Sequence, residues 1–106
     1  MTKIVYNKLV RDNIPEILRA KGKKFQVHIA DENEYYTRLM AKLREEVDEL
    51  LEYPCIEELA DVYEVLSELS DKLGYTQQDI NEARIKKNHE RGAFKKKYIL
   101  ESVSEE

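Results

Sequence analysis

The sequence has few of the residues that build tight turns, cross-links or membrane spans. It contains three glycines, two prolines, one cysteine (Cys55) and no tryptophan. So little glycine and proline argues against an all-β domain, which needs many turns. A single cysteine excludes an intrachain disulfide and therefore a disulfide-stapled secreted scaffold. No segment approaches the ~18 apolar residues of a membrane span, and residues 1–9 lack a signal-peptide run, so we expect a cytoplasmic protein that does not engage a membrane.

Charged residues are abundant and unevenly distributed. They make up 38% of the chain, above the roughly 25% that is usual, which suits amphipathic helices with solvated outer faces. Residues 31–71 hold fourteen acidic and three basic side chains, whereas residues 84–97 hold seven basic and one acidic. One fold that joins these regions around a metal and a phosphate would explain the asymmetry, and so would two solvated faces. The asymmetry alone favours the solvated faces.

Apolar periodicity and capping residues predict an all-α fold, a bundle of about four helices in one domain over residues 1–106. Asp31 and Thr76 are typical N-caps, Pro15 suits a first turn, and Gly22 and Gly74 end helices. The expected helices run from about Asn13 to Gly22, from Asp31 to Pro54, from Ile56 to Gly74 and from Gln77 to Arg91. Residues 25–29 alternate apolar and polar side chains and predict a short strand or an extended segment, which could pair with residues 4–5.

The second and third helices carry apolar stripes. The expected stripe of the third helix consists of Ile56, Leu59, Val62, Leu66, Leu69 and Leu73. Tyr53, Tyr63 and Val65 lie off the main stripes, which predicts a second apolar surface for helix packing between copies of the chain.

Two pairs of acidic residues flank Pro54. Glu46 and Glu49 lie on the second helix, and Glu58 and Asp61 lie on the third. A spacing of three puts each pair on one helix face. Because the turn is short, we expect an antiparallel hairpin with Glu46 level with Asp61 and Glu49 level with Glu58. At about 100° per residue both pairs point to the same side of the hairpin, so four carboxylates converge.

A divalent cation would remove the repulsion within such a cluster. Ligand sets made only of oxygen suit Mg²⁺, with Mn²⁺ as a substitute. The alternative is a solvated acidic face, because the pairs Glu68 with Asp71 and Asp61 with Glu64 share the same spacing. Spacing alone favours the solvated face, and the symmetry of the hairpin makes the two interpretations about equal.

Residues 45–49 read Glu-Glu-Val-Asp-Glu and residues 58–61 read Glu-Leu-Ala-Asp. This order resembles the Glu-Glu-x-x-Glu and Glu-x-x-Asp signature of the MazG-like, all-α nucleoside triphosphate pyrophosphohydrolases, a superfamily that includes phosphoribosyl-ATP pyrophosphohydrolase. Residues 6–15 and the Arg-Gly-Ala-Phe element at 91–94 are similar to a phosphoribosyl-ATP pyrophosphohydrolase-like branch, so the resemblance covers nearly the whole chain.

The sequence departs from the family pattern at three places. Ala93 replaces a second glycine, Asn13 stands where lysine is usual, and only eight residues separate Glu49 from Glu58. The short separation bears on substrate choice more than on metal binding.

The resemblance implies a hydrolase that uses Mg²⁺ to cleave a nucleoside triphosphate to monophosphate and pyrophosphate, as a homodimer or homotetramer. The implied metal ligands are Glu46, Glu49, Glu58 and Asp61. Glu45 is implied as an extra ligand or base, and it completes the set of candidate catalytic residues. Phosphoryl chemistry also needs cations beside the phosphates. The candidates are Lys87 and Arg91 on the fourth helix, and Lys8 and Arg11 in the opening segment. For all four, a role in surface solubility alone is at least an equal alternative.

Other functions stay open. Within the enzymes, the substrate is a standard nucleotide, a damaged nucleotide of the cellular pool or phosphoribosyl-ATP. A non-enzymatic helical binding module could use residues 84–97 to contact nucleic acid or an acidic partner. The strongly acidic remainder of the chain argues against nucleic acid. A purely structural dimeric bundle would bind no Mg²⁺.

Overall fold

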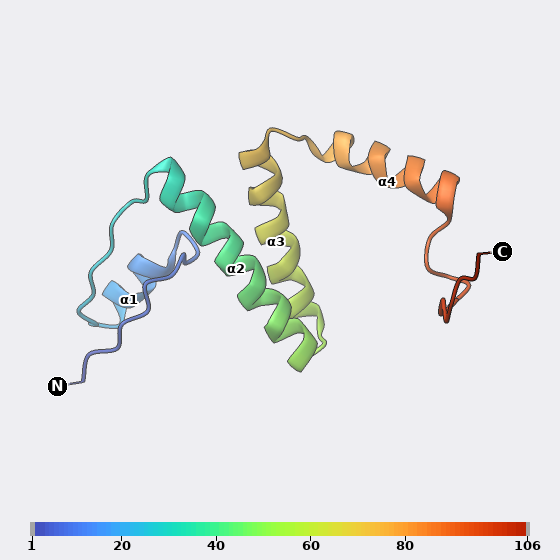
Figure 1. Cartoon of the computed structure of the whole chain (residues 1–106). Coiled ribbons are helices and arrows are strands. Elements are labelled where there is room, and N and C mark those ends of the chain that lie inside the picture. Colours follow the sequence, from blue (N-terminus) through green and yellow to red (C-terminus); the bar gives the residue numbers. More distant parts are fainter. Residues whose placement is uncertain (1, 106) are drawn as a thin grey trace. The chain divides into compact units, whose positions relative to one another are not determined.

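The computed structural model describes residues 2–105 and contains four α-helices (Figure 1). They are α1 (Ile14–Ala20), α2 (Glu32–Glu52), α3 (Ile56–Leu73) and α4 (Gln77–Arg91). No strand occurs in the described range, which confirms the all-α prediction. Helices α1 to α3 belong to one compact unit, Met1–Gly74, and α4 belongs to a second, Tyr75–Glu106. Over the described residues, no helix is both long and apolar enough to cross a membrane.

Local hydrogen bonds set the ends of the longer helices. At the start of α2 the Asp31 side chain accepts a hydrogen bond of 2.8 Å from the backbone N–H of Glu34. At the start of α4 the backbone N–H of Thr76 donates to Asp79 Oδ2 at 2.9 Å, and the backbone N–H of Asp79 donates to Thr76 Oγ1 at 3.1 Å. Helix α3 ends at Gly74, whose φ of +86° is left-handed. These caps lie where the sequence predicted them.

Helices α2 and α3 form an antiparallel hairpin, in which the two ribbons lie side by side (Figure 1). Residues near the start of α2 contact residues near the end of α3. Tyr35 Oη donates to Glu68 Oε2 at 3.2 Å, and Lys72 forms an ion pair with Glu32. These contacts lie far from the turn at residues 53–55, so they hold the two helices in register along their length.

The buried core of the hairpin is small, and the residues that α3 contributes to it differ from the predicted stripe. Leu39 of α2 is 1% exposed, and Val62 and Val65 of α3 are also buried. Leu59 and Leu66, which were expected in the packed stripe of α3, are more than two-fifths exposed, whereas Val65 was expected on a second surface. Helix α3 has two apolar faces and only one packs against α2. Periodicity identifies apolar faces but does not choose between them.

Residues 25–29 form no strand, so the strand is the wrong one of the two predicted alternatives. These residues belong to an irregular connection between α1 and α2, and Val27 and Ile29 are exposed. Ile4 and Val5, the expected partners, are exposed as well. A stable strand needs a hydrogen-bonded neighbour and a face to bury, and within residues 2–105 this segment has neither.

Candidate metal centre

Three carboxylates meet between α2 and α3. Glu46 comes from α2, and Glu58 and Asp61, one turn apart, come from α3. Each offers an oxygen atom, and these three atoms lie within 4.8 Å of one another. The antiparallel hairpin brings Glu46 close to both Glu58 and Asp61. We call Glu46, Glu58 and Asp61 the acidic triad.

Glu46 is the most buried member of the acidic triad. It is 5% exposed and lies two turns after Leu39 on the packed face of α2. Its Oε1 is 3.1 Å from Lys42 Nζ. Its Oε2 and the Oε2 of Glu58 are buried and have no hydrogen-bond partner among the described residues. Buried carboxylate oxygens without partners are costly, so both atoms have unused capacity to bind a cation.

Electrostatics at Glu46 also favour a cation. Burial raises the pKa of Glu46, Lys42 opposes that shift, and the negative charge of Glu49 adds to it, so the net pKa is raised. The ionised form of Glu46 is therefore less favourable here than in a glutamate exposed to water. A positive ion beside it would stabilise the ionised form.

The dimensions of the acidic triad suit a small hard cation. Mg²⁺ binds oxygen at about 2.1 Å, so neighbouring ligands lie about 3 Å apart and opposed ligands about 4 Å apart. The oxygen atoms of the triad lie within 4.8 Å of one another, so small side-chain rotations would bring them to these separations. Donor sets made of carboxylates suit Mg²⁺ or Mn²⁺.

Two of the five predicted catalytic carboxylates lie outside the acidic triad. Glu49 is half-buried on α2, near enough for its charge to act on Glu46. Glu45 instead contacts lysines, with Oε1 2.9 Å from Lys8 Nζ and Oε2 3.4 Å from Lys42 Nζ. Burial raises the pKa of Glu45, but the hydrogen bond from Lys8 and the charge of Lys42 outweigh it and the net pKa is lowered. Glu45 is therefore held as an ionised partner of the two lysines.

The N-terminal segment places two predicted phosphate-binding cations against acidic side chains. Lys8 pairs with Glu45, and Arg11 Nη2 lies 2.7 Å from Asp61 Oδ1. Asn7, directly before Lys8, has a left-handed φ of 45°, a conformation that asparagine tolerates better than most residues. The structure thus brings Lys8 and Arg11 to the edge of the acidic triad.

Lys42 is a site residue that the sequence interpretation missed. Its side chain is largely buried and contacts both Glu45 and Glu46. The spacing of three and four residues on one helix was the available signal. The other two predicted cations, Lys87 and Arg91, are exposed on α4 in the unit Tyr75–Glu106.

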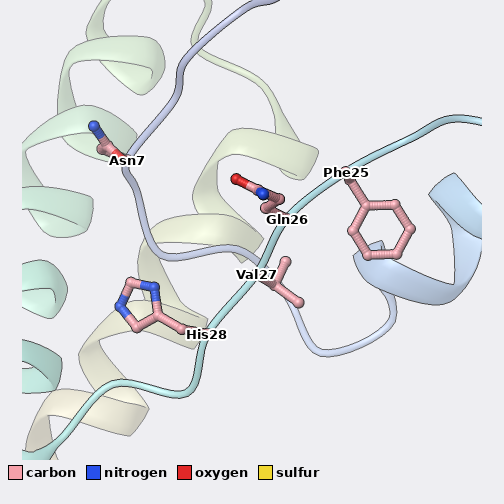
Figure 2. Close-up of a pocket in the computed structure, with 5 residues that line it drawn as sticks. All are labelled: Asn7, Phe25, Gln26, Val27 and His28. Atoms are coloured by element: carbon pink, nitrogen blue, oxygen red, sulfur yellow. The ribbon is translucent and has the colours of Figure 1, made fainter.

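An open pocket of about 600 Å³ lies between the N-terminal segment and the connection from α1 to α2. Its lining residues are Asn7, Phe25, Gln26, Val27 and His28. Figure 2 shows Gln26 and His28 on the same side of the connection as Asn7, with Phe25 on the opposite side. A smaller space beside Asn7 is lined also by Lys8, Lys42 and Glu45. Asn7 therefore borders both spaces, and the smaller one extends to Lys42 and Glu45.

Comparison with known proteins gives a partial match. A stretch of 42 residues is 50% identical to part of an uncharacterized protein from Mycolicibacterium smegmatis. The stretch covers 40% of this chain and 43% of the relative, so less than half of either protein is matched. No protein-family profile and no solved structure matches the chain. A match of this extent leaves the family open, and any function has to follow from the chain's own residues.

Proposed function

We propose that this chain is a Mg²⁺-dependent nucleotide pyrophosphohydrolase of the MazG-like kind, which cleaves a nucleoside triphosphate or a related nucleotide to monophosphate and pyrophosphate. The observation that carries the proposal is the acidic triad, in which Glu46 and Glu58 each have a buried oxygen without a partner. The resemblance of residues 45–61 to the signature of that superfamily points to the same chemistry. A solvated face does not explain a nearly buried acid beside two others, and Lys42 pairs with only one of the two carboxylate oxygens of Glu46.

In this proposal the acidic triad holds the ion, and Glu49 is the fourth ligand. Mg²⁺ bound there would supply positive charge to neutralise phosphate oxygens and to activate a water molecule. The chain's own contribution is to keep the ligands charged and in place. Lys42 offsets the charge of Glu46, and in the absence of the ion Arg11 offsets the charge of Asp61. The packing of α2 against α3 sets the spacing of the ligands.

The nucleotide would extend from the acidic triad along the N-terminal segment. Lys8 and Arg11, which pair with Glu45 and Asp61, would contact phosphates at its edge, and Lys87 and Arg91 remain proposed cations for the leaving pyrophosphate. The pocket beside Asn7, at about 600 Å³, is within the usual range for small-molecule sites. The side chains of Asn7, Gln26 and His28 supply both donors and acceptors for the edge of a base.

We also propose that the chain forms a homodimer or homotetramer through an exposed apolar face of the hairpin. On α3 this face consists of Ile56, Leu59, Tyr63, Leu66 and Leu73. Successive members are three, four, three and seven residues apart, a spacing typical of helices that pack on other helices. At about 100° per residue they lie on the other side of Val62 from Glu58 and Asp61. Assembly through this face would leave the acidic triad accessible.

A pyrophosphate-release screen tests the proposed function. The substrates are standard and damaged nucleoside triphosphates and phosphoribosyl-ATP, each with and without Mg²⁺. We expect Mg²⁺-dependent release by the wild-type chain and a loss of about 100-fold or more in Glu58→Gln. Glu57→Gln is the matched control, because Glu57 is an exposed neighbour outside the acidic triad.

The screen also separates the alternatives. Preferred cleavage of phosphoribosyl-ATP would assign that substrate to the chain. Full activity of Glu58→Gln would contradict the assigned site. A salt-dependent shift of RNA or DNA, with no pyrophosphate released from any substrate, would favour a binding module built on residues 84–97.

A further inference from the structure

Arg11 pairs with Asp61, which is also a member of the acidic triad proposed to hold the cation. We propose that Arg11 is an internal counterion of Asp61, that a divalent cation displaces it, and that the released guanidinium then binds a substrate phosphate. This inference rests on the proposed cation site and adds a coupling between metal binding and substrate binding. It gives Arg11 two partners in turn, Asp61 without the ion and a phosphate with it.

The ion pair between Arg11 and Asp61 is exposed and can dissociate easily. Its Nη2 lies 2.7 Å from Asp61 Oδ1, but 58% of the arginine side chain is exposed. Arg11 lies before α1 in a segment without helix or strand, fifty residues from its partner in sequence. Lys42 is different, because its side chain is only 17% exposed and pairs with Glu46 within one helix. Of these two cations, Arg11 is the one free to leave.

The balance of interactions favours the ion over the guanidinium. Exposed ion pairs are weak, because water and salt screen them. A divalent ion carries twice the charge of Arg11 and reaches all three members of the acidic triad. Two of those members, Glu46 and Glu58, have a buried oxygen without a partner, which Arg11 leaves unsatisfied. The ion therefore gains contacts that the guanidinium does not make.

Displacement leaves the planar guanidinium group of Arg11 with free N–H donors beside the bound cation. Two of these donors can hydrogen-bond to two phosphate oxygens at once. Lys8 need not move, because its partner Glu45 is outside the acidic triad. The two predicted phosphate-binding residues of the N-terminal segment thus differ, and only Arg11 is coupled to the cation.

The Mn²⁺ affinity of the chain, residues 1–106, tests this competition by the direction in which it changes. Calorimetric titration compares the wild type with Arg11→Gln and with Arg44→Gln. Removing a competitor should make Arg11→Gln bind Mn²⁺ about three- to fivefold more tightly, as expected for loss of an exposed ion pair. Arg44 is exposed on α2, so Arg44→Gln makes the same charge change without removing a contact to Asp61. We expect it to match the wild type.

Equal or weaker Mn²⁺ binding by Arg11→Gln would overturn the inference while leaving the cation site in place, because Arg11 would then position Asp61 rather than compete for it. An equal gain in Arg44→Gln would overturn it too. Absence of binding by the wild type would instead overturn the proposed function, and this inference with it. Circular dichroism of each variant checks that the helices are intact.

The side-chain resonance of Arg11 gives a second readout. In the wild type the NMR signal of the Arg11 Nε–H group should shift on addition of Mg²⁺. It should move toward its position in Asp61→Asn, which lacks the charged partner. A signal that stays unchanged in saturating Mg²⁺ would show that the guanidinium remains on Asp61 and would overturn the proposal.

Discussion

Lys42 and Glu46 are one helical turn apart on α2 and form an ion pair of 3.1 Å in which the nearly buried glutamate uses only one of its two carboxylate oxygens. The pair explains how an acidic side chain is tolerated on the packed face of a helix, because a nearby positive charge offsets part of the cost of burial. It also leaves the other oxygen without a partner. The proposed cation site depends on that incomplete pairing.

Replacing Lys42 should destabilise the protein, because burial of the Glu46 carboxylate is unfavourable without the nearby positive charge. In Lys42→Met the carboxylate keeps its burial and loses its cation, so we expect the free energy of unfolding without metal ions to fall by about 1–3 kcal/mol. Urea denaturation at neutral pH measures this change. In a Glu46→Gln background the same substitution should cost much less. Equal losses in both backgrounds would mean that the two side chains are not coupled.

The capping box of α4 should make the start of that helix sensitive to acid. The backbone N–H of Thr76 and its side chain lower the pKa of Asp79 from the ordinary value of 3.8. Because the folded pKa is below the unfolded one, this stabilisation is present above pH 3.8 and is lost as the pH falls through the lower folded value. Amide NMR signals of residues 76–80 should follow that titration, and Asp79→Asn should abolish it. A midpoint above 3.8 would contradict the assigned hydrogen bonds.

The exposed apolar face of α3 should control assembly. Tyr63 is 71% exposed, so Tyr63→Glu should disturb the single chain little while placing a charge in the proposed interface. We expect the wild type to be a dimer or tetramer by light scattering, and Tyr63→Glu to dissociate into monomers at micromolar concentration. Asn88→Glu adds the same charge on α4 and should not dissociate the assembly. A monomeric wild type would contradict this part of the account.

Lys87 and Arg91 should matter for catalysis if they contact the leaving pyrophosphate. They are one turn apart and share a face of α4. A charged hydrogen bond is worth about 1.5–3 kcal/mol, so Lys87→Gln and Arg91→Gln should each lower kcat/KM about 10- to 100-fold. Lys86→Gln, one residue away on another face, is the matched control. Unchanged kcat/KM in both variants would assign these residues to the protein surface alone.

Short-range features of the fold could be predicted because they depend on neighbouring residues. The bond from Glu34 to Asp31, the left-handed Gly74 and the capping box of Thr76 all act within a few residues. The hairpin also followed from local signals, since two amphipathic helices flank a short turn at Pro54. Residue types and their spacing were enough for these features.

Features that depend on long-range packing were missed. Sequence periodicity placed Val65 off the packed face and Leu66 on it, because α3 offers two apolar faces and only tertiary contact selects one. Tertiary contact also buries Glu46 in the hairpin, at 5% exposed, which its spacing from Glu49 did not indicate. The pair between Arg11 and Asp61 joins residues fifty positions apart and leaves no periodic signal.

Equilibrium binding of Mn²⁺ to the metal-free chain, read by electron paramagnetic resonance and competed with Mg²⁺, tests most directly whether carboxylates from α2 and α3 share one cation. The account predicts saturable binding by the wild type and by Glu57→Gln, and affinity at least about tenfold weaker in Glu58→Gln and Asp61→Asn. No saturable binding by the wild type, or equal binding by all four proteins, would contradict it.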